Sequence, residues 1–480
     1  MIKLYNTLSL KKQSFKPLHG KLVKIYTCGP TVYDFAHIGN LRTYIFEDIL
    51  RRMLKYNNYK IKQVMNITDV EDKIIKKAQQ EKKDIYAITK PYTKIFLDDL
   101  KKLNIEKVEF YPKATEHIKE MIALIKKMLT KKFAYQGEDG SVYFNISKFK
   151  NYGKLSQLEK REIKIGARIN ADEYKKENAQ DFVLWKTTLD KTGLREIKAE
   201  WQSPWGWGRP GWHIECSAMA MKYLGETLDI HAGAVDLIFP HHENEIAQSE
   251  AATGKKFAKY WLHGEHLLVD NQKMSKSLGN IFTLRDTEKR NFNPLAFRYL
   301  ILTTHYRSKL NFSWKSLKAA QNGLDRLYKI ASALTAPRHD KEITFFSARN
   351  DKKIQKYKKE FLAAINDDLN IPKALSIVWQ IISAKGGFAS DEKYSGISSA
   401  TKKQMLLEFD KVLGLGLTKI KPFSPKMNQI PQKIRQMADQ REKLRVNKQF
   451  IQADTLRKQI KELGYKIEDT AFGFKIRKQV

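Results

Sequence analysis

The stretch KIYTCGP, residues 24–30, begins the part of the sequence that decides the fold. Its first four residues are typical of a short buried strand, which Gly29 and Pro30 break. Apolar residues then recur at helical spacing from about 43 to 55, and a second strand-like run covers 61–67. Strand, helix and strand in this order predict a βαβ unit, and therefore a parallel α/β sheet with helices on its faces.

Several polar residues follow these strands. Parallel sheets of this kind bind their ligands outside the carboxyl ends of the strands. Cys28, the turn around His37 and the sequence NITD at 66–69 all fall at that edge. Strand-like runs at 227–231 and 259–263 predict that the sheet resumes after an insertion. We therefore expect the functional site at the carboxyl edge of this sheet.

The remaining sequence predicts further regions around this Rossmann-like domain. Asp139-Gly140 is typical of a hairpin turn inside the insertion, the pattern from about 290 to 415 is mainly helical, and prolines mark a linker near 422–431. The expected regions are a split Rossmann-like domain at 1–110 and 200–265, an insertion at 111–199, a loop region at 266–320, a helical bundle at 321–420 and a small C-terminal domain at 421–480.

The charge of the chain is strongly positive. Lys and Arg number 88 against 53 Asp and Glu, a net charge of +35. Such a surplus favours a polyanionic partner, nucleic acid before membrane, although a genome base bias toward lysine codons explains it equally well. The N-terminus has no signal-peptide run and no stretch of 18 apolar residues occurs, so we expect a cytoplasmic protein without a membrane span. With only two cysteines, 28 and 216, a disulfide framework is not expected.

Two motifs are suited to nucleotide phosphates. The sequence TVYDFAHIGN at 31–40 runs into a helix, where a glycine permits close approach and an imidazole lies beside the helix N-terminus. Alone, it fits an ordinary turn with a capping histidine equally well. The string KMSKS at 273–277 places two lysines on a loop that could close over a triphosphate. A lone pair of lysines is usually solvated surface, but this string after an HIGN turn is far more specific.

Together, HIGN at 37–40 and KMSKS at 273–277 resemble the two signatures of class I aminoacyl-tRNA synthetases. DFVLWK at 181–186, GWHIECSAM at 211–219 and PHHENE at 240–245 narrow the resemblance to the cysteinyl-tRNA synthetase family. The similarity extends from about residue 2 to the C-terminus. It implies that 1–110 and 200–265 form the catalytic domain, 111–199 the connective insertion, 266–320 the KMSKS loop and stem-contact region, and 421–480 a small RNA-binding domain that reads the anticodon. It implies an enzyme that activates L-cysteine with ATP and magnesium and then transfers it to the 3′ end of tRNA(Cys); we expect a monomer.

The resemblance also implies roles for individual residues. Those assigned to catalysis or to ATP are His37, Gly39, Asn40, Lys273, Ser275 and Lys276. Those assigned to the substrate cysteine are Thr68, Trp212 and Asp236, for which a strand end, a core residue and a loop cap are the alternatives. Asn40 stands where histidine is frequent across class I, but asparagine also occurs in this family, so the expected change in phosphate contacts is small.

A zinc site is the most specific implication. His241 and Glu245 are spaced i, i+4, which on a helix places them on one face, and with two thiolates they form an acceptable zinc ligand set. By spacing alone, buried apolar cysteines and a surface pair fit equally well. The family's zinc ligands match Cys28, Cys216, His241 and Glu245, although His242 could replace His241 geometrically. One zinc per chain would bond the thiolate of cysteine and reject serine, so no editing domain is required.

The C-terminal segment distinguishes the remaining hypotheses. Residues 426–478 include nine lysines and five arginines, Arg441 and Arg445 among them, but only six acidic residues. This excess suits a surface that binds RNA phosphates, and it fits a solvated amphipathic helix as well. Ile476 stands where the family usually has tryptophan, so stacking of an anticodon base at this position is not predicted. A ligase that joins cysteine to an amino sugar would share the site but lack this segment. A non-catalytic RNA-binding paralogue would have lost His37 or Lys276, and both are present.

Overall fold

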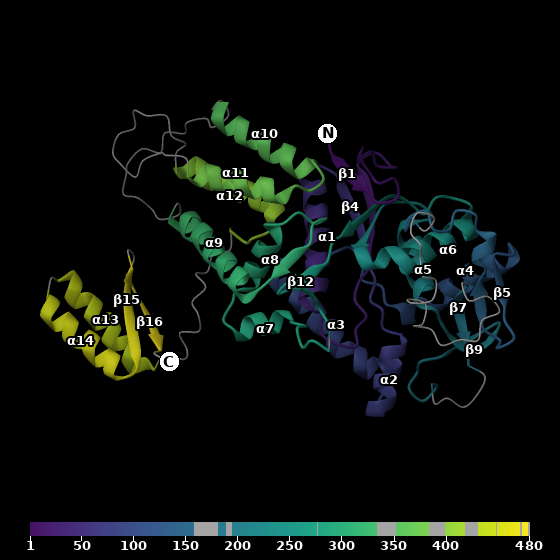
Figure 1. Ribbon diagram of the computed structural model, residues 1–480, viewed down its shortest axis with the longest axis horizontal. Coiled ribbons are helices and arrows are strands. Elements are labelled where there is room, and N and C mark those ends of the chain that lie inside the picture. Colours follow the sequence, from purple (N-terminus) through teal and green to yellow (C-terminus); the bar gives the residue numbers. More distant parts are fainter. Residues whose placement is uncertain are drawn as a thin grey trace. The chain divides into compact units, whose positions relative to one another are not determined.

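The computed structural model divides into two compact units, Met1–Ile420 and Lys421–Val480, which are described separately. Figure 1 shows the elements of both units. Among the described residues, no helix combines the length and the apolar character that a membrane crossing needs. The structure describes residues 1–157, 181–188, 194–275, 277–333, 352–383, 399–417, 431–447, 449–470 and 473–478.

A four-stranded sheet, parallel throughout, lies at the centre of the first unit. Its spatial order is β11 (Ala258–Gly264), β10 (Leu228–Ala234), β3 (Leu22–Thr27) and β4 (Lys60–Met65). Helix α1 (Ile38–Tyr56) joins β3 to β4, so the predicted βαβ unit is confirmed, as are the two later strands. The helix begins five residues earlier than its apolar pattern suggests, because a capping box at its start stabilises the first turn.

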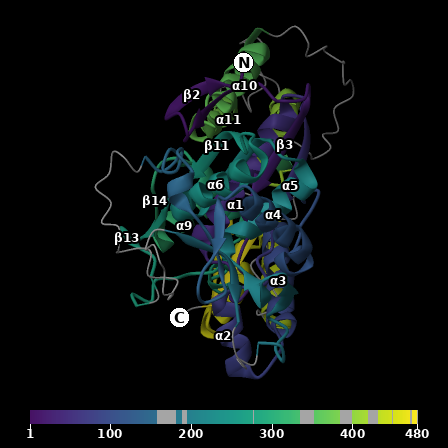
Figure 2. The same cartoon turned by 90° about the vertical axis from the view of Figure 1, so that its right-hand side faces the viewer.

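Each face of this sheet has its own apolar core. Successive side chains of a strand point to opposite faces, and Ile25 accordingly packs with α1 while its neighbour Tyr26 packs with α5 (Trp212–Leu224) and α6 (Glu243–Thr253). Figure 2 gives a side view of these helices and strands. The sheet is therefore covered on both faces, and ligands can reach it only at its edges.

The strand order creates a switch point beside β3. The chain passes from β3 to β4 on one side and later returns to the other side of β3 as β10. Connections on both sides of such a point leave a crevice at the carboxyl ends of the two central strands. Cys28 directly follows β3 there, and its amide nitrogen lies 3.4 Å from the carbonyl oxygen of Ala232 in β10. The fold thus places Cys28 at this crevice.

The segment between β4 and β10 adds a second sheet, which is antiparallel. Its spatial order is β5 (Ala134–Gln136), β6 (Val142–Phe144), β7 (Phe182–Thr187), β9 (Gly206–Pro210) and β8 (Trp201–Ser203). The turn predicted at 139–140 lies between β5 and β6 and is confirmed. The expected end of the insertion at 199 falls between β7 and β8, inside this sheet. The finer division of the first unit into regions stays a prediction.

Helices dominate the rest of the first unit, as the pattern from 290 to 415 predicts. Buried Asp48 in α1 accepts a hydrogen bond from Arg298 at 2.5 Å and one from Arg52 at 2.7 Å, which attaches α8 to the sheet region. The remaining helices of this unit are α2 (Asp72–Glu81), α3 (Ile85–Lys102), α4 (Ile118–Thr130), α7 (Leu284–Lys289), α8 (Pro294–Leu302), α9 (Trp314–Ala333), α10 (Lys352–Asn366), α11 (Ile371–Ser383) and α12 (Ser399–Leu413). Its short strands are β1 (Lys3–Asn6), β2 (Lys11–Ser14), β12 (Leu267–Val269), β13 (Gln272–Lys273) and β14 (Leu310–Phe312).

The second unit is a small helix–sheet domain. Helices α13 (Gln432–Val446) and α14 (Phe450–Glu462) precede a hairpin of β15 (Tyr465–Thr470) and β16 (Gly473–Lys478), and Ile476 packs against their common core. Arg441, which the sequence analysis counted toward a basic face, is instead 1% exposed and paired with Asp469 at 2.5 Å. That arginine stabilises the domain and is not available to phosphates.

Candidate active site

Three separate segments bring the four predicted metal ligands together. Cys28 follows β3, Cys216 lies in the second turn of α5, and His241 and Glu245 flank the start of α6. One ligand atom from each of these residues lies within 4.8 Å of the other three, and all four side chains are buried. His241 lies in the wide turn Ile238–His242 and not in regular helix, yet its Nε2 is 3.1 Å from Glu245 Oε1. The expected juxtaposition therefore arises from a turn and a helix together.

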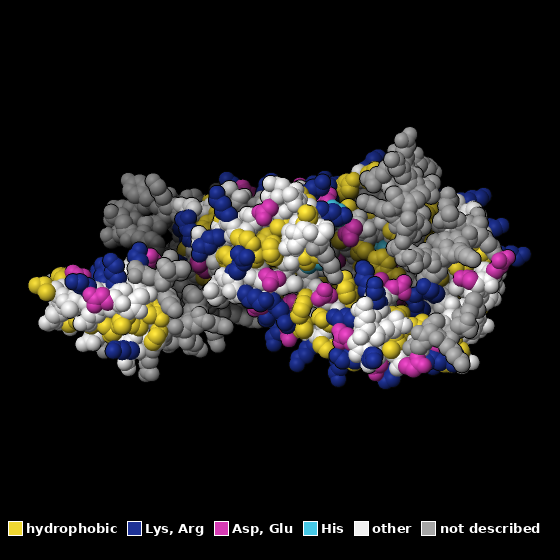
Figure 3. Space-filling model, turned by 60° about the horizontal axis from the view of Figure 1, so that its bottom comes forward, with side chains coloured by type: hydrophobic (Ala, Val, Ile, Leu, Met, Phe, Trp, Pro, Cys, Tyr) yellow, Lys and Arg dark blue, Asp and Glu magenta, His cyan; other side chains and the backbone are white. Residues whose placement is uncertain are grey.

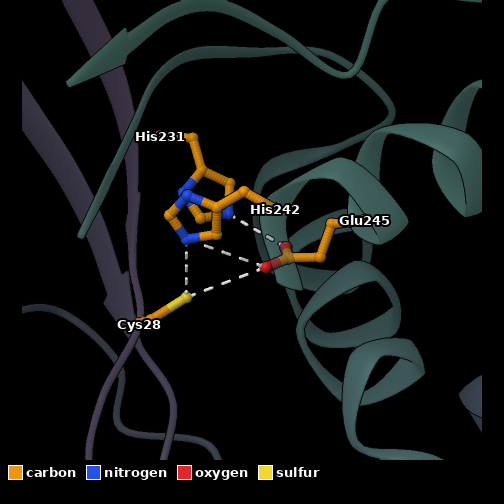
Figure 4. A group of neighbouring side chains, drawn as sticks. All are labelled: Cys28, His231, His242 and Glu245. Carbon is orange, nitrogen blue, oxygen red and sulfur yellow. Dashed lines mark hydrogen bonds and ion pairs between the residues drawn. The ribbon is translucent and has the colours of Figure 1, made fainter. Parts of the chain in front are cut away.

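A second group of possible ligands shares two members with the first. Cys28 and Glu245 also lie within 4.8 Å of ligand atoms of His231 and His242. Cys28 Sγ is 3.3 Å from His242 Nε2, and His231 Nε2 is 2.9 Å from Glu245 Oε2. Figure 4 shows the two imidazole rings beside each other, with Glu245 and Cys28 turned toward them. The choice between His241 and His242, which the sequence leaves open, thus needs a further argument.

The surroundings of the two histidines differ. The ring of His241 packs 4.2 Å, centroid to centroid, from that of Trp212, and Trp212 is 38% exposed. Both histidines are buried, but His242 faces the interior, where its Nδ1 lies 2.8 Å from Nε2 of the buried His263. A metal that binds a substrate needs an open coordination position on a side that the substrate can reach. The group with His241 and Cys216 therefore fits a substrate-binding metal site better than the group with His242.

A second layer of histidines supports this cluster, and the sequence analysis missed it. His213 Nδ1 is 2.9 Å from His241 Nδ1, His231 contacts Glu245, and His263 bridges His242 and the hydroxyl of Thr7 at 2.7 Å. Hydrogen bonds of this kind orient the ligands of metal sites. A signal existed, because both runs predicted as strands, 227–231 and 259–263, end on a histidine.

The ionisable groups of the cluster shift one another's pKa values. Burial disfavours the thiolate of Cys216, but the hydrogen bond with Cys28 and the nearby His241 lower its pKa to about 6. Burial likewise disfavours the charged form of Glu245, yet His231 and His241 lower its pKa to about 2. His241 is desolvated, but Cys216 and Glu245 raise its pKa to about 10. Two sulfurs, an imidazole and a carboxylate are thus buried together, and they form a donor set that fits zinc.

Residues at the carboxyl ends of β3 and β4 lie next to the cluster. The amide of Gly29 donates to Asn66 Oδ1 at 2.9 Å, and a methyl group on Gly29 would overlap the carbonyl oxygen of Asn66. Only glycine allows this approach of the two strand ends. Thr68 is buried and donates to Glu215 Oε2 at 3.1 Å, next to Cys216 in sequence. Thr68 therefore lies near the cluster, and its predicted contact with the substrate stays a prediction.

The first nucleotide motif forms the start of α1. The amide of Asn40 donates to His37 Nδ1 at 3.1 Å, and the amide of His37 donates to Asn40 Oδ1 at 3.2 Å. His37 is thus a helix cap, but the cap uses only Nδ1 and leaves Nε2 for another partner. Burial lowers the pKa of His37, while the nearby carboxylate of Asp236 works against that shift. His37 can therefore cap the helix and still contact a nucleotide phosphate, as predicted. Asp236, the predicted partner of the substrate ammonium group, lies in the turn Val235–Leu237 after β10.

The second nucleotide motif lies against the first. A methyl group on Gly39 would overlap the end of the Met274 side chain, although the two residues are far apart in sequence. Within the loop, Asn280 Oδ1 accepts from the amide of Ser275 at 2.9 Å, and Asn280 Nδ2 donates to the carbonyl of Lys273 at 3.3 Å. Lys276 lies outside the described residues. The structure therefore brings both motifs to one place, and the roles of their residues stay predictions.

Comparison with known proteins defines first the class and then the family. Residues 14–322 match the family model described as tRNA synthetases class I (C) catalytic domain. Cysteine–tRNA ligases of Protochlamydia amoebophila and Chlamydia felis are 44% and 46% identical to this chain, covering 100% and 99% of it and 98% and 97% of their own sequences. The chain therefore belongs to the cysteine–tRNA ligase family, and the enzyme is an aminoacyl-tRNA ligase.

Solved structures confirm the fold. Methionyl-tRNA synthetase of Mycobacterium tuberculosis in complex with methionyl-adenylate superposes with a TM-score of 0.56, covering 85% of this chain and 92% of that one. A leucyl-tRNA synthetase complex from Agrobacterium radiobacter K84 gives 0.57, covering 84% of each chain. Identities of 14% and 10% limit this likeness to the fold. The predicted α/β class is confirmed as that of class I aminoacyl-tRNA synthetases.

Proposed function

We propose that this enzyme activates L-cysteine with ATP and transfers the cysteinyl group to the 3′ end of tRNA(Cys). Membership of the cysteine–tRNA ligase family supports this reaction. The observation that carries the choice of cysteine is the buried cluster of Cys28, Cys216, His241 and Glu245 at the switch point of the sheet. A soft donor set at the place where ligands bind favours a substrate that carries a thiol.

These four residues would hold one zinc ion. When bound there, zinc supplies a bond to the substrate thiolate that the hydroxyl of serine cannot match. Shape alone discriminates such closely similar substrates by only about 1–3 kcal/mol. The ring of Trp212 would cover the ligand His241 and form a wall of the amino-acid pocket. His213 and His231 would hold His241 and Glu245 in their ligating orientations.

The residues around the cluster would position the substrates. Asp236 would bind the ammonium group of cysteine, and Thr68 would lie beside it at the neighbouring strand end. The cysteine carboxylate oxygen then attacks the α-phosphorus of ATP, the bond to the bridging oxygen breaks, and magnesium pyrophosphate leaves. Nε2 of His37 and the amide group of Asn40, at the positive end of α1, would stabilise the charge on the α-phosphate.

The 273–280 loop would act on the departing phosphates. Lys273 and Lys276 carry the charges that would neutralise pyrophosphate, and Ser275 would contact the nucleotide. The contact between Met274 and Gly39 supports this proposal because it sets the loop against the start of α1. In the second step, the terminal ribose hydroxyl of the tRNA attacks the cysteinyl carbonyl and AMP leaves. Positioning and charge stabilisation are sufficient for both steps.

The unit at 421–480 would recognise the tRNA. Its excess of basic residues supports this role, although Arg441 is engaged within the unit. The proposed use of tRNA as a substrate also supports a cytoplasmic location for the enzyme. We further propose that the chain acts as a monomer, since the four ligands and both nucleotide motifs come from one chain.

Cysteine-dependent exchange of pyrophosphate into ATP tests the first step. We expect exchange with cysteine to exceed exchange with serine by at least about 10³-fold, with about one zinc per chain in the purified protein. Transfer to tRNA and to a free amino sugar are then compared. Cysteinyl-tRNA as the product supports the proposal, whereas a cysteine–amino sugar amide would replace it with the rival ligase. Exchange that does not distinguish cysteine from serine would contradict the role of the cluster.

A further inference from the structure

Arg42 differs from the other buried arginines of the chain. It lies on α1, two residues after Asn40, and is 3% exposed. Within the described residues, each of the other buried arginines forms an ion pair with a carboxylate: Arg51, Arg52, Arg209, Arg298 and Arg441. Figure 3 shows many further lysine and arginine side chains at the surface, where water solvates them. Among the described arginines, Arg42 therefore combines burial with the lack of an ionic partner.

Main-chain carbonyl groups take the place of a carboxylate around Arg42. Its Nη1 donates to the carbonyl oxygen of His266, and its Nη2 donates to that of Ser308. Nη2 also lies 3.5 Å from the carbonyl oxygen of His305. Because the guanidinium is a planar fork whose donors point in fixed directions, it holds these carbonyls in one geometry. Arg42 therefore joins α1 to segments that lie 224 and 266 residues further along the chain.

The burial of this charge opposes stability. Desolvation lowers the pKa of Arg42 to about 10, although the carboxylate of Glu265 works against the shift. A buried charge without an ionic partner is costly, so packing alone would favour an apolar side chain at this position. Natural proteins break such local rules mainly at functional sites. We therefore expect the geometry that Arg42 imposes to serve the reaction.

Both segments that Arg42 holds lead into the strands that carry the 273–280 loop. His266 directly precedes β12, and Ser308 lies two residues before β14, which pairs with β12 in parallel. On its other side β12 pairs with β13, whose last residue is Lys273. Figure 1 shows β12 beside α1. The position of Lys273 relative to α1 therefore depends on the two carbonyl groups that Arg42 binds.

The chain after the loop is attached to α1 as well. The amide of Ile38, the first residue of the helix, donates to the carbonyl oxygen of Phe282 at 2.8 Å. Arg42 thus binds the chain before the loop, and the first residue of the same helix binds the chain after it. Because α1 also begins with His37 and Asn40, one helix places both nucleotide motifs relative to each other.

We propose that Arg42 is a positioning residue for the activation step, which fixes the distance between the start of α1 and Lys273 by holding the carbonyl groups of His266 and Ser308. The inference rests on the proposed function, in which the start of α1 stabilises the α-phosphate and Lys273 the departing pyrophosphate. Arg42 acts through Lys273 and does not touch the nucleotide itself. A lysine in its place would retain the charge, but one ammonium group on a flexible stem cannot hold both carbonyls as the fork does.

The test retains the charge and removes the fork. Arg42→Lys is compared with Arg52→Lys, because Arg52 is also buried on α1 and donates to the carbonyls of Lys411 and Asn104, away from both motifs. In cysteine-dependent pyrophosphate exchange, we expect Arg42→Lys to lower kcat about 10-fold, as a misplaced group does, with zinc content and KM for cysteine unchanged. Transfer to tRNA from preformed enzyme-bound adenylate should keep its rate, because pyrophosphate has already left. Arg52→Lys should leave kcat unchanged, even where it lowers the melting temperature.

A double-mutant cycle decides whether Arg42 acts through Lys273. We expect Lys273→Gln to lower kcat about 100-fold, as the loss of one charge-stabilising donor does. Adding Arg42→Lys should then lower kcat by less than about 3-fold more, because residues that act as a unit are not additive.

Three outcomes would overturn the inference. They are losses that multiply to about 10³-fold in the double variant, a full kcat in Arg42→Lys, and equal losses of kcat in Arg42→Lys and Arg52→Lys. In each of them the unaltered enzyme still exchanges pyrophosphate with cysteine, so the proposed function stands. Absence of exchange in the unaltered enzyme would contradict the proposed function and this inference together.

Discussion

Two regions of the candidate active site differ in how firmly they are held: the cluster of four metal ligands and the loop at 273–280. The four residues of the cluster are each at most 7% exposed, and each one belongs to a strand end, a helix or the turn before a helix. In the loop at 273–280, Leu278 is 56% exposed, and the side chains of Asn280 and Ser275 form hydrogen bonds between the described residues of its two ends. The cluster is embedded in an apolar core, to which both of its cysteines belong, whereas the loop is held by a few hydrogen bonds.

This difference matches two different tasks. Selection of a small amino acid requires ligands held in place before the substrate arrives, because reorganisation would reduce discrimination. A loop that covers a triphosphate has to open and close in each cycle. We therefore expect changes in the cluster to abolish metal binding and activity together, and changes in the loop to slow the reaction while the metal stays bound.

The largest effect is expected from Cys216→Ser. Serine retains the volume of the side chain but replaces a thiolate with a poor zinc ligand, so zinc content should fall to near zero. Exchange of pyrophosphate should fall by at least about 10³-fold, since outer-shell changes alone cost 10–100-fold. Atomic absorption and the exchange assay measure the two quantities on one sample. A variant that loses zinc but retains exchange would contradict the proposed role of the cluster.

The next effect distinguishes the two histidines. His241→Gln should remove most of the zinc and lower exchange by more than about 100-fold, because a ligand is lost. His242→Gln, its matched control one residue away, should lower zinc affinity by about 10-fold, as expected for a residue outside the ligand set. Competition with a chelator measures both affinities. The reverse order would assign the metal to the group of Cys28, His231, His242 and Glu245.

Asn280→Ala tests the loop. Without its amide, the hydrogen bonds to Ser275 and to Lys273 disappear, and the loop is held less firmly by the remaining contacts of the Ser275 hydroxyl with Ser277 and Leu278. We expect kcat for exchange to fall about 10-fold, which corresponds to about 1.4 kcal/mol of transition-state stabilisation, with zinc content and KM for cysteine unchanged. Leu278→Ala in the same exposed loop is the control and should have no effect. Loss of zinc from Asn280→Ala would remove the contrast between the two regions.

The smallest effect is expected at the boundary between cluster and solvent. Trp212→Phe retains an aromatic ring over His241 but reduces the contact, and aromatic pairs contribute about 0.5–1.5 kcal/mol beyond area burial. KM for cysteine should therefore rise about 3-fold. Trp207→Phe, on a tryptophan of similar exposure (37% against 38%) in β9, is the control. An equal change in both variants would show that Trp212 has no special place at the pocket.

Local patterns were sufficient for much of the fold. The βαβ unit, the later strands and the hairpin turn follow from periodicity and turn residues, which report on neighbours in sequence. The start of α1 was placed too late, because its cap uses His37 and Asn40, which carry no apolar signal. Arg441 was misjudged for a related reason, since its charge says nothing of Asp469, which lies 28 residues away and binds it in the folded unit.

The sequence by itself determined the family, both nucleotide motifs and four candidate ligands, because these depend on short strings and on residue chemistry. Tertiary structure alone decided which side chains meet. It placed His241 beneath Trp212, put His213, His231 and His263 behind the ligands, and set Met274 against Gly39. The physical reason is that contacts of this kind join segments far apart in sequence, by more than 250 residues for Thr7 and His263. Packing around a shared core fixes such contacts, and no local sequence pattern encodes that packing.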